Sequence, residues 1–304
     1  DKARSPAVSK LTQAYKASDL DVSAFDAAMA IYGEGKYSQA IKAFNQFLDE
    51  FPRSQLRFRA RYWMGQALTQ EQEHEKAQKT YEDLLRDSPL TYYGLLASIA
   101  CGEPLDSAID AELPTATSSD AFLQPHEVLR IQRGERFLVE KAYDLALQDL
   151  REIRSRDAVS PTFLMYLASL NFEAGNYPST FSILGDLINR GHPGVYSTYA
   201  LRMIFPTVHL ELIQKQAGAV KLDPILVLSL MKQESAFDSY AMSWVGATGL
   251  MQLMPLTSKG LAKRMGVAHR PYDPEFNVEA GALLLSRLLD IFDGDLHLAL
   301  AGYG

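Results

Sequence analysis

The sequence predicts an all-α fold, in which an array of helical hairpins is followed by a second, smaller helical domain. Two segments of the first half repeat at a fixed offset, with small and aromatic residues at helical spacing. No convincing run of alternating apolar and polar residues, the pattern of a half-buried strand, occurs along the chain. The length of 304 residues suits about two domains and a sizeable core.

The helical hairpins are predicted from an internal repeat. Segment 36–52, KYSQAIKAFNQFLDEFP, aligns with segment 73–89, EHEKAQKTYEDLLRDSP, at an offset of 37 residues. The aligned pairs are Ala40/Ala77, Phe44/Tyr81, Phe47/Leu84 and Pro52/Pro89. A small residue lets two helices approach closely, the larger residues form a stripe along one helix face, and proline blocks continuation of the helix.

Further copies extend this array. Segments 141–153 and 175–188 repeat the pattern more loosely. Gly65 lies twelve residues before Ala77, which fits the glycine of a tetratricopeptide-type unit. Because each hairpin buries its apolar face against the next one, stacked hairpins give a tetratricopeptide-like helical-repeat superhelix.

Two breaks in the pattern predict the domain organisation. Segment 102–120, GEPLDSAIDAELPTATSSD, is rich in Pro, Ser, Thr and Asp, and we interpret it as a connection within the helical array. Segment 190–197, RGHPGVYS, closes the last repeat. We therefore expect a helical-repeat domain over residues 1–200 and a second domain over residues 201–304.

Composition and charge disfavour several classes of function. The net charge of -7, without a long basic run, disfavours a nucleic-acid partner. The longest near-continuous apolar stretch, Ile225 to Met231, is far shorter than the roughly 20 residues of a membrane span. The six histidines lack metal-ligand spacing, and the single cysteine excludes an internal disulfide. We expect no metal, no cofactor, no nucleic acid and no membrane span.

Glu234 is the candidate catalytic residue. It ends the segment 221–235, KLDPILVLSLMKQES, in which Asp223 suits the N-cap and Pro224 the first helical position. Residues 225–231 are apolar nearly all round, which predicts a helix buried in a core. Apolar neighbours and the helix C-terminus would both raise the pKa of the Glu234 carboxyl, as a general acid requires. Taken alone, the position favours the ordinary alternative, a solvated glutamate at a helix end.

The loop that follows Glu234 combines several groups that suit a sugar. Gly246 and Gly249 lie among small residues, so that backbone can approach a ligand closely. Ser243 offers a hydroxyl, Gln252 an amide, and two methionines offer soft apolar contacts. Composition alone leaves open whether the methionines are core residues and the glycines ordinary turns.

The stretch 234–255, ESAFDSYAMSWVGATGLMQLMP, resembles the signature of the soluble lytic transglycosylases, bacterial enzymes with a lysozyme-like domain that cleave peptidoglycan. The shared pattern is Glu-Ser, a serine nine residues after the glutamate, and Gly-Leu-Met-Gln-x-Met-Pro. Segments 273–292 and 299–303 are also similar to this family. SPLTYYGLLA at 88–97 and the helical repeats resemble the superhelical N-terminal part of its periplasmic members.

The resemblance implies a fold, an activity and a set of site residues. It implies a lysozyme-like catalytic domain that cleaves the β-1,4 bond between MurNAc and GlcNAc and forms 1,6-anhydroMurNAc. Glu234 would be the catalytic acid/base, and the substrate-binding residues would be Ser243, Met251, Gln252, Met254 and Tyr303. The partners would be peptidoglycan glycan strands and, through the repeats, proteins of the cell wall, and the location would be the periplasm.

The end of the chain departs from the family pattern. The family continues its third motif as Ala-Tyr-Asn-Ala-Gly, whereas residues 301–304 of this chain are AGYG. We therefore expect a transglycosylase domain that is incomplete at its C-terminus.

Two other functions stay open from the sequence. A goose-type lysozyme-like hydrolase on the same scaffold would need a carboxylate that positions water, and Asp238 is the nearest candidate along the chain. A non-catalytic scaffold would only grip peptidoglycan through its terminal domain. Product analysis separates the two enzymes, and turnover that depends on Glu234 would exclude the scaffold.

Overall fold

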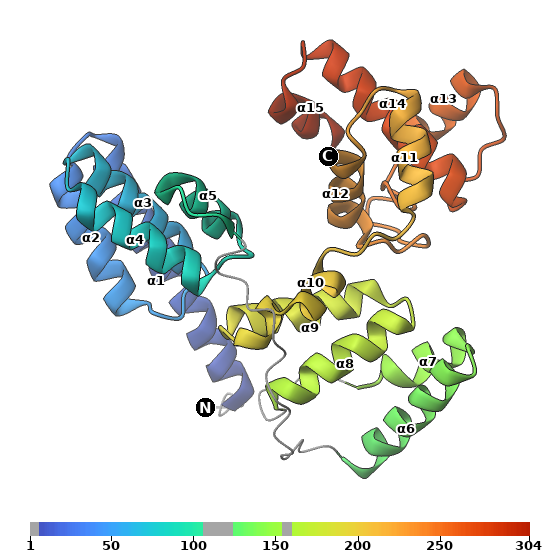
Figure 1. Ribbon diagram of the computed structural model, residues 1–304, viewed down its shortest axis with the longest axis horizontal. Coiled ribbons are helices and arrows are strands. Elements are labelled where there is room, and N and C mark those ends of the chain that lie inside the picture. The colour runs from blue at the N-terminus through green and yellow to red at the C-terminus, as the bar shows by residue number, and fades with distance from the viewer. Residues whose placement is uncertain (1–5, 106–123, 154–159) are drawn as a thin grey trace, which may run out of the picture. The chain divides into compact units, whose positions relative to one another are not determined.

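The computed structural model describes residues 6–105, 124–153 and 160–304, and these residues form an all-α fold (Figure 1). Within these ranges the only strand-like pairings are two isolated bridges, both in the loop after Glu234. The predicted fold class is therefore confirmed. The predicted connection at 102–120 lies mostly outside the described residues. A search of the helices in the same ranges finds none with the length and apolar character needed to cross a membrane.

Contacts divide the chain into two compact units, and each is described by itself. Unit 1 comprises residues 1–115 and 187–200, and unit 2 comprises residues 116–186 and 201–304. The predicted domains, 1–200 and 201–304, are defined by sequence pattern and stay a prediction, whereas the units are defined by packing. Residues 116–186, which the pattern assigns to the repeats, share unit 2 with the segment that carries Glu234.

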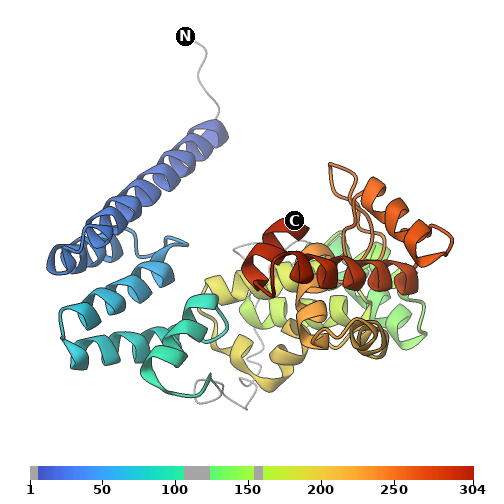
Figure 2. The ribbon, with the colours of Figure 1, turned by 90° about the horizontal axis from the view of Figure 1, so that it is seen from above.

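Unit 1 contains the two strongest repeats. Its helices are α1 (Pro6–Gly33), α2 (Tyr37–Glu50), α3 (Arg57–Gln70), α4 (His74–Asp87) and α5 (Tyr92–Cys101), with the 3-10 helix η2 (Pro193–Tyr196). Each helix from α1 to α5 packs against the next one along the chain (Figures 1 and 2). All six predicted helix-contact residues are buried: Ala40, Phe44, Phe47, Ala77, Tyr81 and Leu84.

Gly65 shows why these hairpins need a small residue. A Cβ atom at Gly65 would lie 2.5 Å from Cε1 of Tyr81, so only glycine lets α3 approach α4 this closely. Gly134 repeats the device in the next hairpin, where a Cβ atom would lie 3.1 Å from Cδ2 of Leu150. Gly134 also precedes the buried Ala146 by the same twelve residues that separate Gly65 from Ala77. The hairpin predicted from the looser copy at 141–153 is thereby confirmed.

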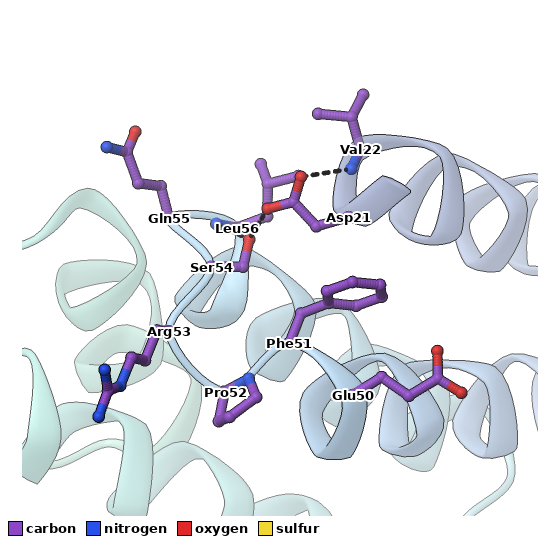
Figure 3. Close-up of a pocket in the computed structure, with 9 residues that line it drawn as sticks. All are labelled: Asp21, Val22, Glu50, Phe51, Pro52, Arg53, Ser54, Gln55 and Leu56. Atoms are coloured by element: carbon purple, nitrogen blue, oxygen red, sulfur yellow. Dashed lines mark hydrogen bonds between the residues drawn. The ribbon is translucent and has the colours of Figure 1, made fainter. Parts of the chain in front are cut away.

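A small polar cluster joins the turn between α2 and α3 to α1. The Ser54 hydroxyl donates to Asp21 Oδ2 at 2.6 Å, and the backbone N–H of Leu56 donates to Ser54 Oγ at 3.0 Å. Ser54 and Asp21 line a hollow of about 660 Å³ together with the side chain of Phe51 (Figure 3). These bonds fix the turn between α2 and α3.

Unit 2 joins two helical hairpins to the C-terminal helices. Its helices are α6 (Pro125–Val139), α7 (Tyr143–Leu150), α8 (Pro161–Glu173), α9 (Tyr177–Asn189), α10 (Thr198–Ile204), α11 (Leu210–Ala219), α12 (Pro224–Ser235), α13 (Pro255–Met265), α14 (Pro274–Ile291) and α15 (Leu296–Tyr303). The last residues of α9 and the first residues of α10 belong to unit 1. Helices α11 and α15 both pack against α14 (Figure 1). The core between them includes Ile213, Met231, Leu250 and Leu285.

Helix α12 is buried on one side only. Val227 and Met231 are fully buried, whereas the side chain of Ile225 is 59% exposed. The expectation of a helix enclosed all round is therefore wrong at its N-terminal turn, where α12 lies at the surface. The C-terminal half, which carries Glu234, packs into the core as expected.

Candidate active site

Glu234 lies in the last turn of α12, where the local sequence fixes both ends of the helix. The Asp223 carboxylate caps the N-terminus and accepts the Ile225 N–H at 2.8 Å, and Pro224 occupies the first turn. At the other end Ala236 adopts φ +49°, and its N–H bonds to the carbonyl of Lys232 at 3.0 Å. Both predicted start signals are confirmed, and the helix ends one residue after Glu234.

The Glu234 side chain is partly buried, and burial raises the pKa of its carboxyl above the ordinary value. This direction agrees with the expectation from the sequence. A carboxyl group that keeps its proton closer to neutrality can donate that proton to a leaving group. The raised pKa of the Glu234 carboxyl therefore meets one requirement of a general acid.

Aromatic packing holds the chain directly after Glu234. Phe237 is buried and has φ +63°. The centroid of its ring lies 6.0 Å from that of Tyr177 and 6.2 Å from that of Phe181, both in α9. Positive φ is costly for a bulky residue, so that surrounding contacts must hold it there. Within unit 2, helix α9 supplies those contacts and thereby fixes the exit of the helix that carries Glu234.

Ser243 lies in a tight loop stabilised by its own side chain. The Ser243 hydroxyl oxygen accepts the N–H of Ala247 at 3.0 Å, and the backbone N–H of Ser243 donates to the carbonyl of Ala247 at 2.9 Å. Gly246 sits inside this loop with φ +89°, a conformation that glycine adopts without a steric cost. The bridges of Thr248 to Met242 and to Leu253 close the loop at its base.

Gln252 adopts a left-handed conformation, with φ +46°. Its side-chain nitrogen Nε2 donates to the carbonyls of Ala241 at 3.1 Å and Gly249 at 2.9 Å. Since both N–H donors are engaged by backbone, the atom left for a ligand is the side-chain oxygen, which accepts hydrogen bonds. Gln252 is thus suited to a donor such as an amide N–H or a sugar hydroxyl.

The two predicted lining methionines occupy different environments. Met254 is 45% exposed just before α13 and is free to contact a ligand. Met251 is fully buried, and its side chain packs on α14 at Gly281, where a Cβ atom would lie 2.6 Å from Met251 Cβ. The structure thus places Met251 in the core beneath the loop, so that its side chain does not face solvent.

The charge of Glu234 acts on Tyr303 although 69 residues separate them along the chain. Its hydroxyl donates to the carbonyl of Met251 at 3.0 Å. Burial, and to a smaller extent the charge of Glu234, raises the pKa of the Tyr303 hydroxyl, which therefore stays protonated at neutral pH. Tyr303 therefore joins α15 to the loop through a hydroxyl that is fixed on the Met251 carbonyl.

Asn277 of α14 is a site-forming residue that sequence reasoning did not find. Its side chain is fully buried, and its Oδ1 accepts the N–H of Met251 at 2.7 Å. Its Nδ2 donates to the carbonyls of Thr248 at 3.0 Å and Pro271 at 2.8 Å. A polar residue amid the apolar run FNVEAGALLL of α14 was the available signal, because a buried amide is normally there to bond backbone.

The Asp238 carboxylate stabilises a local turn of the backbone. Its carboxylate accepts the N–H of Tyr240 at 2.9 Å, an Asx-turn geometry, and the residue is exposed. Nothing in these contacts directs the carboxylate toward Glu234. Among the described residues no group of three or more His, Cys, Asp or Glu side chains is arranged to hold a metal ion.

Comparison with protein families identifies the C-terminal segment. Residues 211–304 match the family described as transglycosylase SLT domain, and residues 32–99 match the tetratricopeptide repeat family. This chain contains an SLT domain. The resemblance of segment 234–255 to the soluble lytic transglycosylases is thereby confirmed, since the whole segment lies inside the SLT domain.

Relatives with curated descriptions match a limited part of the chain. The membrane-bound lytic murein transglycosylase C of Actinobacillus pleuropneumoniae serotype 5b (strain L20) is 38% identical over 88 residues, which are 27% of this chain and 24% of the relative. The transglycosylase of Enterobacteria phage PRD1 is 43% identical over 93 residues, 31% of this chain and 33% of the relative. The chain thus spans between about a quarter and a third of the length of these relatives.

Solved structures resemble a much longer part of the chain. An inactive mutant of the lytic transglycosylase Slt from Pseudomonas aeruginosa has a TM-score of 0.66 at 22% identity, covering 91% of this chain and 43% of that one. The 70-kDa soluble lytic transglycosylase of Escherichia coli has a TM-score of 0.60 at 20% identity, covering 87% and 41%. These likenesses support the fold, helical repeats with an SLT domain of lysozyme-like architecture.

Proposed function

We propose that this chain is a lytic transglycosylase that cleaves the MurNAc–GlcNAc β-1,4 bond of peptidoglycan and forms 1,6-anhydroMurNAc, with Glu234 as the single acid/base. The observation that carries the proposal is the Glu234 carboxyl, whose pKa is raised by burial and which lies in the segment that matches the SLT domain. The murein transglycosylases named above support the substrate class.

In the first step Glu234 acts as an acid. Its carboxyl donates a proton to the glycosidic oxygen as the bond from that oxygen to C1 of MurNAc breaks. The raised pKa of Glu234 keeps this proton available nearer to neutral pH. The Gln252 side-chain oxygen is positioned to accept from an N-acetyl N–H, and Ser243 and Met254 would contact the sugar.

In the second step Glu234 acts as a base. Its carboxylate takes the proton of the C6 hydroxyl while that oxygen bonds to C1, which closes the anhydro ring and restores the acid. No water is consumed and the atoms balance. The hydroxyl belongs to the same molecule, so effective concentration favours it over water by up to roughly 7–11 kcal/mol in good geometries.

The hydrolase reading is less well supported. Glycoside hydrolysis usually employs two carboxyl groups, one as acid and one to activate water or attack C1. The only nearby candidate from the sequence, Asp238, is exposed and accepts the N–H of Tyr240. A single well-placed carboxyl favours intramolecular attack.

The helical repeats would then bind rather than catalyse. We propose that they guide the glycan strand or bind cell-wall proteins, and that the protein acts in the periplasm, where peptidoglycan lies. The tetratricopeptide match at residues 32–99 supports a binding role, because stacked repeats form extended surfaces.

The function is tested by digestion of purified peptidoglycan with the wild-type chain and with Glu234→Gln. The variant keeps the shape of the side chain and loses its transferable proton, so release of soluble muropeptides should fall by about 10²–10⁴-fold or more. Asp238→Asn is the matched control and should retain near wild-type release. Wild-type-like release by Glu234→Gln would exclude the proposed acid/base, and a loss in Asp238→Asn equal to that in Glu234→Gln would favour the hydrolase.

A further inference from the structure

Unit 1 contains a hollow whose walls are unusually basic. It has a volume of about 760 Å³ and is bordered by the start of α3, the end of α4 and the segment before η2. Its charged lining residues are Arg53, Arg57, Arg61, Arg86, Arg190 and Asp87. Sites for small molecules usually have volumes of roughly 300–1,000 Å³, so the hollow has the size of a ligand site.

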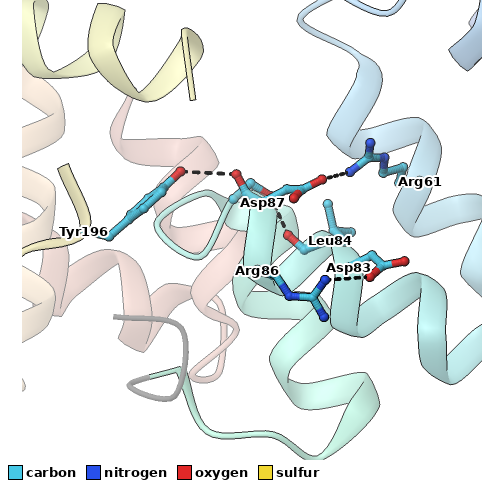
Figure 4. Close-up of polar contacts among 7 residues, drawn as sticks. Arg61, Asp83, Leu84, Arg86, Asp87 and Tyr196 are labelled. Atoms are coloured by element: carbon cyan, nitrogen blue, oxygen red, sulfur yellow. Dashed lines mark hydrogen bonds and ion pairs between the residues drawn. The ribbon is translucent and has the colours of Figure 1, made fainter. Parts of the chain in front are cut away.

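The acidic groups around the hollow offset only part of this charge. Arg61 pairs with Asp87, and Arg86 pairs with Asp83, which lies one turn back on α4 (Figure 4). Arg190 aside, four arginines less these two aspartates leave an excess of two positive charges. The whole chain has a net charge of -7, so this local excess runs against its composition.

Arg57 is held in place by neutral groups. Its guanidinium donates to the carbonyls of Ser54 at 3.0 Å and Asn189 at 3.1 Å and lies 4.0 Å from the ring centroid of Phe58. Burial lowers the pKa of Arg57 and the positive charge of Arg61 lowers it further, while Tyr196 and the Asp87 carboxylate offset only part of this shift. A partly buried cation beside a like charge is unfavourable unless an anion balances it.

Other contacts make the hollow a built feature of unit 1. The Tyr196 hydroxyl donates to the backbone carbonyl of Asp87 at 3.2 Å, which ties η2 to the end of α4 (Figure 4). The side chain of Arg53 extends from the turn after α2, away from Asp21 (Figure 3). Among the described residues no hydrogen bond or ion pair engages the Arg53 guanidinium, which leaves its donors available to a ligand.

We propose that this hollow binds a small ligand that carries two or more anionic oxygen groups, either carboxylates or phosphates. Guanidinium groups bind both kinds in paired, charge-assisted hydrogen bonds, and several arginines around one hollow favour more than one anionic group. Phe58 and Tyr196 provide an apolar wall for the rest of the ligand. The proposal does not depend on the activity of Glu234.

Isothermal titration of the full chain tests this proposal, with citrate and inorganic pyrophosphate as separate probes. The double variant Arg53→Glu/Arg86→Glu reverses two charges in the hollow. Lys42→Glu/Lys79→Glu makes the same charge change at exposed positions of α2 and α4 outside it. We expect saturable binding of one molecule per chain, retained in the lysine variant and at least about tenfold weaker in the arginine variant.

The outcomes separate the sources of the anion and decide the proposal. Binding of citrate alone would indicate a carboxylate ligand, and binding of pyrophosphate alone a phosphate ligand. Arg53→Gln/Arg86→Gln, measured in parallel, should also bind more weakly and covers a failure of the charge-reversed variant to fold. Absence of saturable binding, or equal binding by the arginine and lysine variants, would overturn the proposal. Glu234→Gln should bind the anions as the wild type does, so this result stands apart from the test of catalysis.

Discussion

The side-chain oxygen of Asn277 accepts the backbone N–H of Met251 at 2.7 Å, while the carbonyl of Met251 accepts the hydroxyl of Tyr303 at 3.0 Å. One residue of the loop is therefore held from two helices, α14 and α15. The next residue, Gln252, adopts its left-handed conformation directly after this anchored residue. The position of the loop thus depends on side chains that α14 and α15 supply.

Replacing Asn277 with alanine should destabilise the protein and impair catalysis together. The change removes three hydrogen bonds and leaves buried backbone groups without partners, which should lower the free energy of unfolding by about 2–4 kcal/mol. Urea denaturation measures the first effect and muropeptide release the second. Asn189→Ala, at an exposed position, is the control and should change neither; a neutral Asn277→Ala would contradict this role for Asn277.

Gly249→Ala should disrupt the same loop from the other side. Gly249 has φ +79°, and a Cβ atom there would lie 2.3 Å from Nδ2 of Asn277 and 2.5 Å from the carbonyl oxygen of Pro271. We expect a loss of more than about 2 kcal/mol in stability, measured by thermal or urea unfolding. Gly260→Ala is the matched control, because a Cβ atom meets nothing within 4 Å there and alanine favours the α13 helix by about 0.5–1 kcal/mol. Equal effects of the two changes would show that close packing at Gly249 is not what fixes the loop.

Tyr303→Phe isolates the hydroxyl that joins α15 to the loop. The ring and its packing remain, while the Met251 carbonyl loses its donor at a cost of about 1–3 kcal/mol. We also expect a lower kcat, because this hydroxyl anchors Met251 directly before Gln252 in the loop. Steady-state kinetics on a soluble glycan and urea unfolding test both, with Tyr199→Phe at an exposed position as control. Wild-type kcat and stability in Tyr303→Phe would remove Tyr303 from the site.

The raised pKa of Glu234 predicts a pH-dependent stability difference between the wild type and Glu234→Gln. Burial raises the pKa in the folded state above the value of 4.5 for an ordinary glutamate. Below that value both states are protonated, and the carboxyl has no net effect on stability. As the pH rises above it the unfolded state ionises first, so the wild type loses stability that the glutamine variant keeps.

Thermal unfolding across the pH range measures this difference. The Tm of Glu234→Gln minus that of the wild type should increase from about pH 4 upward and become constant above the folded pKa. Asp238→Asn, whose side chain is exposed, provides the comparison. A difference that stays constant or decreases with pH would contradict a buried, proton-retaining carboxyl at Glu234.

The sequence predicts the features that depend on local spacing. The repeat at an offset of 37 residues correctly predicts the hairpins, because the repeated residues contact neighbours in the same helix or in the next helix along the chain. The N-cap at Asp223 and the position of Glu234 near the helix end follow from the same short-range rules.

The clamp around Met251 could not be predicted in this way. Asn277 and Tyr303 reach Met251 across 26 and 52 residues, and only tertiary packing brings them together. The burial of Met251 could not be predicted from composition either, since methionine occurs both in cores and on sugar-binding surfaces. Likewise, Arg53, Arg57 and Arg61 recur every four residues in the sequence, but their common hollow requires the segment near Asn189.

The most direct test of the central claim is mass spectrometry of the muropeptides released from purified peptidoglycan in water enriched in heavy oxygen. The account predicts that the main products carry a 1,6-anhydroMurNAc end, lack one molecule of water relative to hydrolysis products, resist borohydride reduction and contain no heavy oxygen at the new terminus. It also predicts that Glu234→Gln releases almost none of them. Reducible ends that carry heavy oxygen as the main product would show that water attacks C1, and would contradict cleavage by Glu234 alone.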